Sequence, residues 1–313
     1  WSEKLTYFYQ NHCASSRSVY LNRKTGVYKL ENGKTGLVLE GGGMRGIYTA
    51  GVLDVFLENR IEFDGVIGVS AGAIHGASYV SGQRGRSIRY YRKYCADSRM
   101  MSWKNFFRTG DIVDEKFCYH ELPEKLDPYD YEAFNRSDTK FYVTCTNVET
   151  GCAEYIRITD MKEQIDYIRA SASLPFVSRI VEKDGKKLLD GGCADSIPVE
   201  AFMGMGYGRC VAVLTRQDGY EKKERRNKVA KLRYKKYPAF IRAIENRPWE
   251  YNQTLKRIHE LEKSGDVFVI RPSKALEVGR MSHDRKAVLT AYKQGRMDAK
   301  KCLGELKEWL TQV

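Results

Sequence analysis

The sequence predicts an α/β fold with three layers, in which helices cover both faces of a mainly parallel central sheet. Apolar runs at residues 35–39 and 65–69 are each followed by a turn of small residues and then by a helical pattern. Strands that alternate with helices in this way form parallel sheets with right-handed crossovers. No internal repeat or low-complexity linker interrupts the 313 residues. We therefore expect one domain over residues 35–313, preceded by an N-terminal extension over residues 1–34.

At the start of this domain, predicted strands and helices alternate regularly. Strands are predicted at 35–39 and 65–69, and helices at about 46–59 and 71–80. The following segments are predicted as a helical, aromatic and basic stretch at 87–107, a turn-rich stretch at 123–135, and strands at 140–146 and 153–158. The turn at residues 149–151 makes the last two strands a hairpin.

The second half continues with mixed elements. The predicted elements are a helix at 162–171, strands at 187–189, 210–215 and 267–270, and helical patterns at 254–263 and 284–310. The β-branched content of the strand at 210–215 indicates that it is buried. We expect the strand at 267–270 to join the same sheet, because nothing in the sequence separates it from the rest.

Two glycine-containing turns suggest a chemistry. Residues 41–46 read Gly-Gly-Gly-Met-Arg-Gly, a backbone that can direct N–H groups toward a negative charge at a helix N-terminus. Residues 68–72 read Gly-Val-Ser-Ala-Gly, in which small residues allow the sharp turn that exposes Ser70 as a nucleophile. One turn supplies an anion site and the other an attacking oxygen. Together they predict an ester hydrolase.

A nucleotide-binding protein is an alternative for the first turn. Gly41, Gly43 and Gly46 also satisfy the dinucleotide pattern G-x-G-x-x-G. That function needs an acidic residue at the end of the next strand, whereas Asp64 precedes the strand and Ser70 follows it. The spacing therefore favours the hydrolase over a nucleotide-binding protein. A non-catalytic lipid-binding protein that uses the basic stretch at 222–236 remains an alternative.

The base that activates Ser70 is ambiguous from the residues alone. An α/β-hydrolase-type esterase has the order Ser, acid, His, which would select His259 or His283. His259 lies within a helical pattern and His283 at the start of another. Asp190 instead follows a strand and precedes two glycines, and a carboxylate that is ionised at neutral pH can accept a proton. A Ser-Asp-His triad and a Ser-Asp dyad both remain open at this point.

Three blocks in a fixed order resemble the patatin-like phospholipases. They are residues 40–46, residues 68–72, and residues 190–192 followed by Pro198, and residues 170–175 are also similar to the family. The resemblance covers roughly residues 35–215. Residues 218–313 resemble the extra region of a bacterial branch. The chain departs from the family at Ser196-Ile197, where Asn-Asn often precedes the proline.

The resemblance implies a function and a set of site residues. It implies a patatin-like fold and a serine acyl hydrolase, of lipase or phospholipase A type, that cleaves carboxylic esters of lipids. Ser70 would be the nucleophile and Asp190 its base in a catalytic dyad, with no histidine, metal or cofactor. The implied oxyanion hole comprises Gly41, Gly42, Gly43, Arg45 and Ala71.

The charge distribution predicts a partner. The net charge is +13, and nine of the fifteen residues from 222 to 236 are Lys or Arg. We expect peripheral contact with anionic membrane through Lys222–Lys236, with a solvated helix face as the alternative and nucleic acid disfavoured. No apolar run reaches the roughly 18 residues of a membrane span, and the start lacks a signal-peptide pattern. We expect a cytoplasmic protein.

Overall fold

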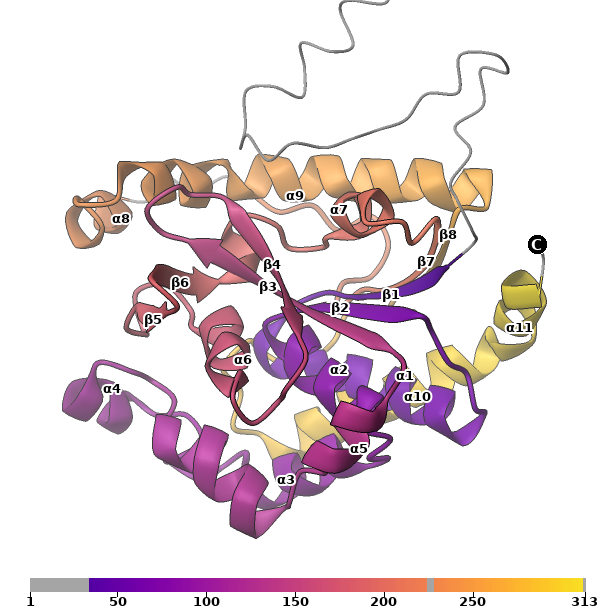
Figure 1. The fold of residues 1–313 in the computed structure, drawn as a ribbon, viewed down its shortest axis with the longest axis horizontal. Helices are drawn as coiled ribbons and strands as arrows, with labels where there is room; N and C mark the ends of the chain where they lie inside the picture. Colours follow the sequence, from indigo (N-terminus) through magenta and orange to yellow (C-terminus); the bar gives the residue numbers. More distant parts are fainter. Residues whose placement is uncertain (1–33, 224–227, 312–313) are drawn as a thin grey trace, which may run out of the picture.

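A computed structural model describes residues 34–223 and 228–311 of the chain. The extension predicted over residues 1–34 therefore lies almost entirely outside the described residues, as do residues 224–227 of the basic stretch. Figure 1 shows three layers, with the sheet between α9 and α7 on one side and α1, α2 and α10 on the other. The predicted α/β fold with a mainly parallel sheet is confirmed.

Eight strands of the described residues form one sheet. They are β1 (Thr35–Leu39), β2 (Gly65–Val69), β3 (Lys140–Asn147), β4 (Ala153–Ile158), β5 (Val181–Lys183), β6 (Lys186–Asp190), β7 (Arg209–Val213) and β8 (Val267–Ile270). Their order is β5-β6-β3-β2-β1-β7-β8, and β4 pairs with β3. The five strands from β3 to β8 in this order are parallel, whereas β4 and β6 run antiparallel to β3. The predicted hairpin and the late strand both join the sheet as expected.

Helices connect the strands. The α-helices are α1 (Ile47–Glu58), α2 (Ala71–Val80), α3 (Arg86–Tyr94), α4 (Trp103–Thr109), α5 (Tyr131–Arg136), α6 (Ile165–Ala172), α7 (Val199–Gly204), α8 (Lys228–Arg233), α9 (Pro238–Ser264), α10 (Arg285–Lys301) and α11 (Leu303–Thr311). The described residues also contain two 3₁₀ turns, η1 (Gly43–Gly46) and η3 (Gly191–Cys193), and a π-helix, η2 (Phe117–Leu126). In this part of the chain, no helix is both long and apolar enough to cross a bilayer.

Apolar clusters fill both faces of the sheet. Val66 of β2 packs with Phe56 of α1 in one cluster. Ile67, the next residue, packs with Phe202 of α7 in another. Successive strand residues point to opposite faces, so a strand covered on both sides needs a continuous apolar run. This is why residues 65–69 are apolar throughout rather than alternating.

Several predicted boundaries were wrong. The helical stretch at 87–107 is two helices, because Ser102 accepts a hydrogen bond from the Asn105 N–H and starts α4 anew. The stretch at 123–135 contains the end of η2 and α5 instead of being mainly turns. The pattern at 284–310 divides at Cys302 into α10 and α11. Local composition does not reveal these breaks, since they depend on caps and tertiary contacts.

Candidate active site

Ser70 lies on a sharp turn between β2 and α2. Its φ of 54° is in the left-handed region, which costs a residue other than glycine about 1–3 kcal/mol. The neighbouring glycines make the turn possible: a Cβ on Gly72 would be 2.3 Å from the Leu39 carbonyl oxygen, and a Cβ on Gly68 would be 2.6 Å from the Ala73 backbone. The side chain of Ser70 is thus held at the carboxyl end of the sheet.

Asp190 reaches the same end of the sheet from an antiparallel strand. Val69 pairs with Thr144 of β3, and the next β3 residue, Cys145, pairs with Asp190 of β6. Ser70 and Asp190 therefore flank β3 at the same level. The Asp190 Oδ1 atom accepts a hydrogen bond from the Gly192 N–H at 2.7 Å, which orients the carboxylate. Ser70 and Asp190 are both buried and line one small cavity, which we call the polar cavity because Arg247 and Arg280 line it too.

The C-terminal end of α6 ties these two residues together. The Ser70 N–H donates to Ser171 Oγ at 2.8 Å, and Ser171 Oγ donates to the Thr144 carbonyl at 2.7 Å. The Asp190 N–H donates to the Ser173 carbonyl at 2.9 Å. One short segment thus fixes the backbone at both positions. The sequence indicated this segment only through its similarity to the family, without giving it a role.

Replacement of Ser171 by alanine should reduce kcat about tenfold or more and leave KM nearly unchanged. The variant leaves the buried Ser70 N–H and the Thr144 carbonyl without their partner, which costs about 1–3 kcal/mol. Ser173→Ala is the matched control, because its own backbone carbonyl still accepts the Asp190 N–H. Kinetics on a short ester and urea unfolding provide the measurements. Equal kcat in the two variants would contradict the positioning role of Ser171.

The glycine-rich turn faces the polar cavity. Gly41, Gly42 and Gly43 all line it, and Gly43 has a φ of +58°. The Met44 N–H donates to the Arg280 carbonyl at 3.0 Å and is therefore already occupied. Among the described residues, no hydrogen bond uses the Gly42 N–H. The turn thus contains an unoccupied backbone donor and lines one cavity together with Ser70.

Glu40 anchors this turn from below. Its carboxylate accepts the Thr215 N–H at 2.6 Å and the Tyr251 hydroxyl at 2.8 Å. These contacts join the end of β1 to the segment after β7 and to α9. The hydroxyl of Thr215 also donates to the Gly41 carbonyl at 3.3 Å. The Gly41 backbone is therefore fixed by a contact with Thr215, which lies 174 residues later in the chain.

The other two residues predicted for the oxyanion hole lie differently. Ala71 lines the apolar cavity described below, at the N-terminus of α2. Arg45 lines neither of the two cavities that contain Ser70. It is buried, and its Nε has no hydrogen-bond partner within the described residues. Burial, followed by the charge of Arg216, lowers the pKa of Arg45 to about 10.

A second cavity, which is apolar and has a volume of about 140 Å³, is also lined by Ser70. Ser70, Gly43 and Leu174 line both this cavity and the polar one. Its walls come mainly from α2, α3, the segment after α3, η2 and α6. They include Ile74, Tyr90, Tyr91, Met100, Met101, Ile112, Leu122, Ile165 and Ile168. Residues of the aromatic stretch predicted at 87–107 are thus among them, and Leu174 and Ser178 also line the cavity.

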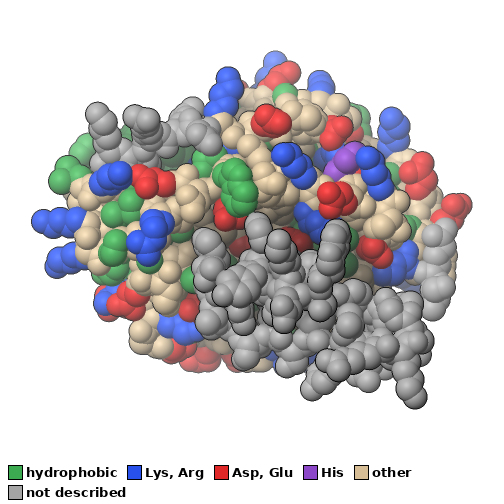
Figure 2. All heavy atoms as spheres, turned by 90° about the horizontal axis from the view of Figure 1, so that it is seen from above, with side chains coloured by type: hydrophobic (Ala, Val, Ile, Leu, Met, Phe, Trp, Pro, Cys, Tyr) green, Lys and Arg blue, Asp and Glu red, His purple; other side chains and the backbone are tan. Residues whose placement is uncertain are grey.

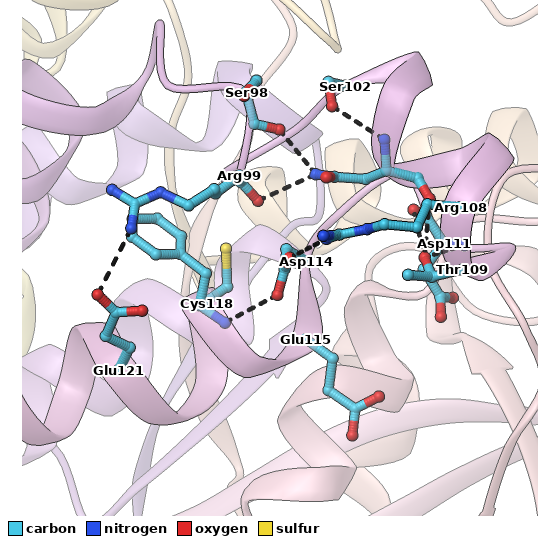
Figure 3. A network of polar contacts seen from close by, with 12 residues as sticks. Ser98, Arg99, Ser102, Arg108, Thr109, Asp111, Asp114, Glu115, Cys118 and Glu121 are labelled. Carbon is cyan, nitrogen blue, oxygen red and sulfur yellow. Dashed lines mark hydrogen bonds and ion pairs between the residues drawn. The ribbon is translucent and has the colours of Figure 1, made fainter.

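A polar network holds one wall of the apolar cavity in place (Figure 3). The Asn105 amide donates to the carbonyls of Ser98 and Arg99 at 2.7 and 3.2 Å. Asp114 accepts the Phe117 N–H at 3.0 Å and also binds Arg108 at 2.6 Å. This network fixes α4 against η2, and with it the cavity-lining residues on either side of α4.

The described histidines make their polar contacts with residues other than Ser70. His259 is exposed and 3.8 Å from a Glu262 oxygen, and His283 Nδ1 is 3.0 Å from the Cys95 carbonyl. His75 is buried against Ser87, and burial lowers its pKa to about 3. Of the histidines that the structure describes, none lines either cavity containing Ser70. His12 is outside the described residues.

Asp64 is at the opposite end of the sheet. Its carboxylate accepts the Thr35 N–H at 2.7 Å, where β1 and β2 begin. Residues 41–46 follow the other end of β1. Asp64 therefore does not lie where a dinucleotide ribose would need it.

Comparison with known proteins identifies the family. The family model described as patatin-like phospholipase matches residues 37–203, which is more than half of the chain. The chain belongs to this family. A second model, described as a domain of unknown function (DUF6363), matches residues 237–311. The patatin-like match thus ends before α9, and the second match covers α9, β8 and the terminal helices.

Several known proteins are similar to this chain. The uncharacterized protein YjjU of Escherichia coli is 26% identical over 287 residues, which cover 90% of this chain and 80% of that protein. Lysophospholipase NTE1 of Saccharomyces cerevisiae is 31% identical over 189 residues, 57% of this chain. Neuropathy target esterase sws of Drosophila melanogaster is 27% identical over 190 residues, 59% of this chain. The matched regions make up only 10% and 13% of these two larger proteins.

One solved structure covers most of the chain. VipD from Legionella pneumophila aligns with a TM-score of 0.45 and 14% identity. The alignment covers 88% of this chain and 67% of that one.

Proposed function

We propose that the protein is a serine acyl hydrolase that cleaves carboxylic esters of lipids, with Ser70 as nucleophile and Asp190 as its base. The observation that carries this proposal is the position of Ser70 at the junction of two cavities. One is polar and contains Asp190 and the glycine-rich turn, and the other is apolar. An amphiphilic ester fits this division with its acyl chain on one side and its polar group on the other.

The reaction proceeds in two steps. Asp190 accepts the Ser70 hydroxyl proton as Ser70 Oγ attacks the acyl carbonyl carbon, and the proton passes to the leaving alcohol as the ester bond breaks. A water molecule then gives a proton to Asp190 and attacks the acyl-serine ester. Ser70 is released with its proton, together with the fatty acid. No other titratable side chain is required.

Backbone N–H groups stabilise the negative charge on the substrate oxygen. We assign this role to the N–H groups of Gly42 and Gly43, in the glycine-rich turn, and to that of Ala71, the first residue of α2. An N–H at a helix N-terminus has no partner within the helix, which leaves it free for an anion. Removing one donor of this kind typically costs about 2.7–4 kcal/mol in the transition state.

A fluorophosphonate probe tests the proposal directly. The probe should label one residue, Ser70, identified by peptide mass spectrometry, and Ser70→Ala should prevent labelling. Pre-incubation with a long-chain monoacylglycerol should slow labelling more than a short-chain ester does, because only the long chain fills the apolar cavity. Labelling at another serine, or none in a folded protein, would refute the assignment of Ser70.

The basic stretch is the candidate for membrane contact. Its described part carries exposed apolar side chains between cations: Val229 and Leu232 are 61% and 79% exposed, beside Lys231. Ala230 and Tyr234 are buried and anchor α8 to the domain. Figure 2 shows hydrophobic and basic side chains side by side at the end of the molecule where α8 lies. We propose that this end touches anionic bilayers.

Replacing Lys231, Lys235 and Lys236 by glutamine should weaken binding to anionic vesicles by up to about 3 kcal/mol at low salt, at about 1 kcal/mol for each cation. Salt should weaken the parent protein's binding too, since the Debye length falls from about 10 Å at 0.1 M to about 3 Å at 1 M. Vesicle sedimentation measures both effects.

The matched control removes the same charge elsewhere. Lys263, Lys300 and Lys301 are exposed and lie outside α8 and the segment that follows it. Their replacement by glutamine should change vesicle binding less. If both triple variants bind equally, net charge rather than the α8 end governs binding, and the proposed contact is wrong.

A further inference from the structure

Two arginines from late in the chain line the polar cavity with Ser70 and Asp190. Arg247 lies on α9 and Arg280 between β8 and α10, so both belong to the region that matches the domain of unknown function. Arg247 Nη2 is 3.0 Å from the place that a Cβ on Gly192 would occupy. Arg280 Cγ is 2.7 Å from the equivalent place on Gly43. The two side chains border the cavity on its aspartate side and its glycine-turn side.

Neither arginine has a carboxylate partner among the described residues. Other partly buried arginines do, such as Arg296 with Glu58 at 2.8 Å. The Nε of Arg247 is buried without a hydrogen-bond partner in this part of the chain. Buried donors without acceptors are costly, and charged ones more so. An anionic ligand in the cavity would supply the missing acceptors.

Further positive charge surrounds the pair. The arginine pair interacts electrostatically with three other basic side chains, those of Arg45, Arg216 and Lys222. Lys222 Nζ lies 3.6 Å from the centre of the Tyr251 ring instead of in solvent. Burial, followed by the charge of Arg247, lowers the pKa of Lys222 to about 6. Cations that lower one another's pKa values lack sufficient counter-charge.

The nearby carboxylates offset only part of this charge: Glu40 raises the pKa values of Arg45 and Lys222, and Asp190 raises that of Arg280, but burial and the neighbouring cations outweigh them. Glu40 is engaged by the Thr215 N–H and the Tyr251 hydroxyl, and Asp190 by the Gly192 N–H. Of the five basic side chains, only Arg247 and Arg280 line the polar cavity, and a pKa of about 6 leaves Lys222 largely uncharged at neutral pH. Four arginine charges therefore stand against those of Glu40 and Asp190. The two arginines that line the polar cavity share it with Ser70 and do not line the apolar one.

We propose that Arg247 and Arg280 bind the phosphate of a glycerophospholipid substrate while its ester carbonyl lies at Ser70. This proposal rests on the proposed hydrolase function and narrows its substrate class. The planar guanidinium group offers paired N–H donors that match phosphate oxygens. In a phospholipid the phosphate is only a few bonds from the ester carbonyl, so a phosphate site must adjoin the oxyanion donors. The region of unknown function then selects the substrate for the patatin-like site.

Substrate pairs that differ only in the phosphate test the proposal. We would compare an oleoyl lysophosphatidylglycerol with oleoylglycerol, which has the same acyl chain and no phosphate. Arg247→Gln and Arg280→Gln should each lower kcat/KM for the lysophospholipid about tenfold or more relative to oleoylglycerol, mainly through KM. Arg280→Gln keeps the backbone carbonyl that accepts the Met44 N–H. Arg242→Gln, an exposed change on α9, is the matched control.

Equal losses on both substrates would overturn the proposal. That result would mean that the arginines act on Asp190 or on the oxyanion, which every ester shares. A selective loss for the lysophospholipid in Arg242→Gln as well would also overturn it, because general surface charge would then explain the preference.

A binding experiment separates this proposal from the hydrolase proposal. Calorimetry should detect binding of glycerophosphoglycerol to the Ser70→Ala protein. Adding Arg247→Gln to this variant should weaken that binding about tenfold or more. This measurement requires no catalysis, so it remains decisive even if no ester is hydrolysed. Tighter binding of inorganic phosphate than of glycerophosphoglycerol would identify a free-phosphate site, and the absence of binding by either probe would refute the phosphate site.

Discussion

Ser70→Ala and Asp190→Asn should each reduce ester hydrolysis by roughly 10⁴-fold or more while the protein remains folded. Without the hydroxyl there is no nucleophile, and without the carboxylate there is no acceptor for its proton. Asparagine preserves an oxygen for the Gly192 N–H, so the turn after β6 should persist. Residues that act as one unit give non-additive losses, so the double variant should be little worse than Ser70→Ala. Steady-state kinetics and thermal unfolding measure both properties.

Histidine variants are the controls for this dyad. His259→Ala and His283→Ala should retain most of the activity, because neither side chain lines a cavity with Ser70. A loss in either variant comparable to that of Asp190→Asn, at unchanged stability, would restore a triad and defeat the dyad assignment.

Gly43→Val should lower kcat by about 10²–10³-fold, the loss expected when one oxyanion donor is displaced. Valine disfavours a φ of +58°, and its Cβ would lie 2.5 Å from the Arg280 carbonyl oxygen. The turn must therefore move. Turnover should be normalised to the folded fraction, determined by circular dichroism, because the strain also destabilises the protein.

Gly279→Val is the matched control for the glycine-turn variant. A Cβ on Gly279 would meet no atom within 4 Å, and this residue precedes the arginine that contacts Gly43. This variant should retain near-normal kcat. Normal hydrolysis of short esters by folded Gly43→Val would show that the turn does not bind the oxyanion.

Local patterns predicted the strand and helix around Ser70 well. The boundaries of β1, β2 and α2 agree with the expected ranges, because buried apolar runs that end at small residues define these elements unambiguously. The hairpin formed by β3 and β4 was also predicted. The π-helix η2 was missed, since Pro123 within it is a strong local signal against a helix. Packing of Phe117 and Leu122 into the core outweighs that signal.

Parts of the site could not be predicted from local sequence. The antiparallel direction of β6, which brings Asp190 level with Ser70, depends on pairing with β3 and not on the residues around Asp190. Arg247 and Arg280 carried no motif, and only the tertiary fold brings them to the cavity. The contribution of Ser171 likewise depends on a backbone N–H 101 residues away in the chain. Roles created by long-range contacts leave no periodic signal.

The hydrogen bond between the Met44 N–H and the Arg280 carbonyl makes the glycine-rich turn depend on a residue that is synthesised late. Its two partners are far apart in the sequence, and at roughly 5–20 residues per second the ribosome needs about 10–50 s to extend the chain from one to the other. Until then, the glycine-rich turn lacks the contact that shapes it. A nascent chain would carry Ser70 early, yet its glycine-rich turn would acquire this contact only after Arg280 has been synthesised.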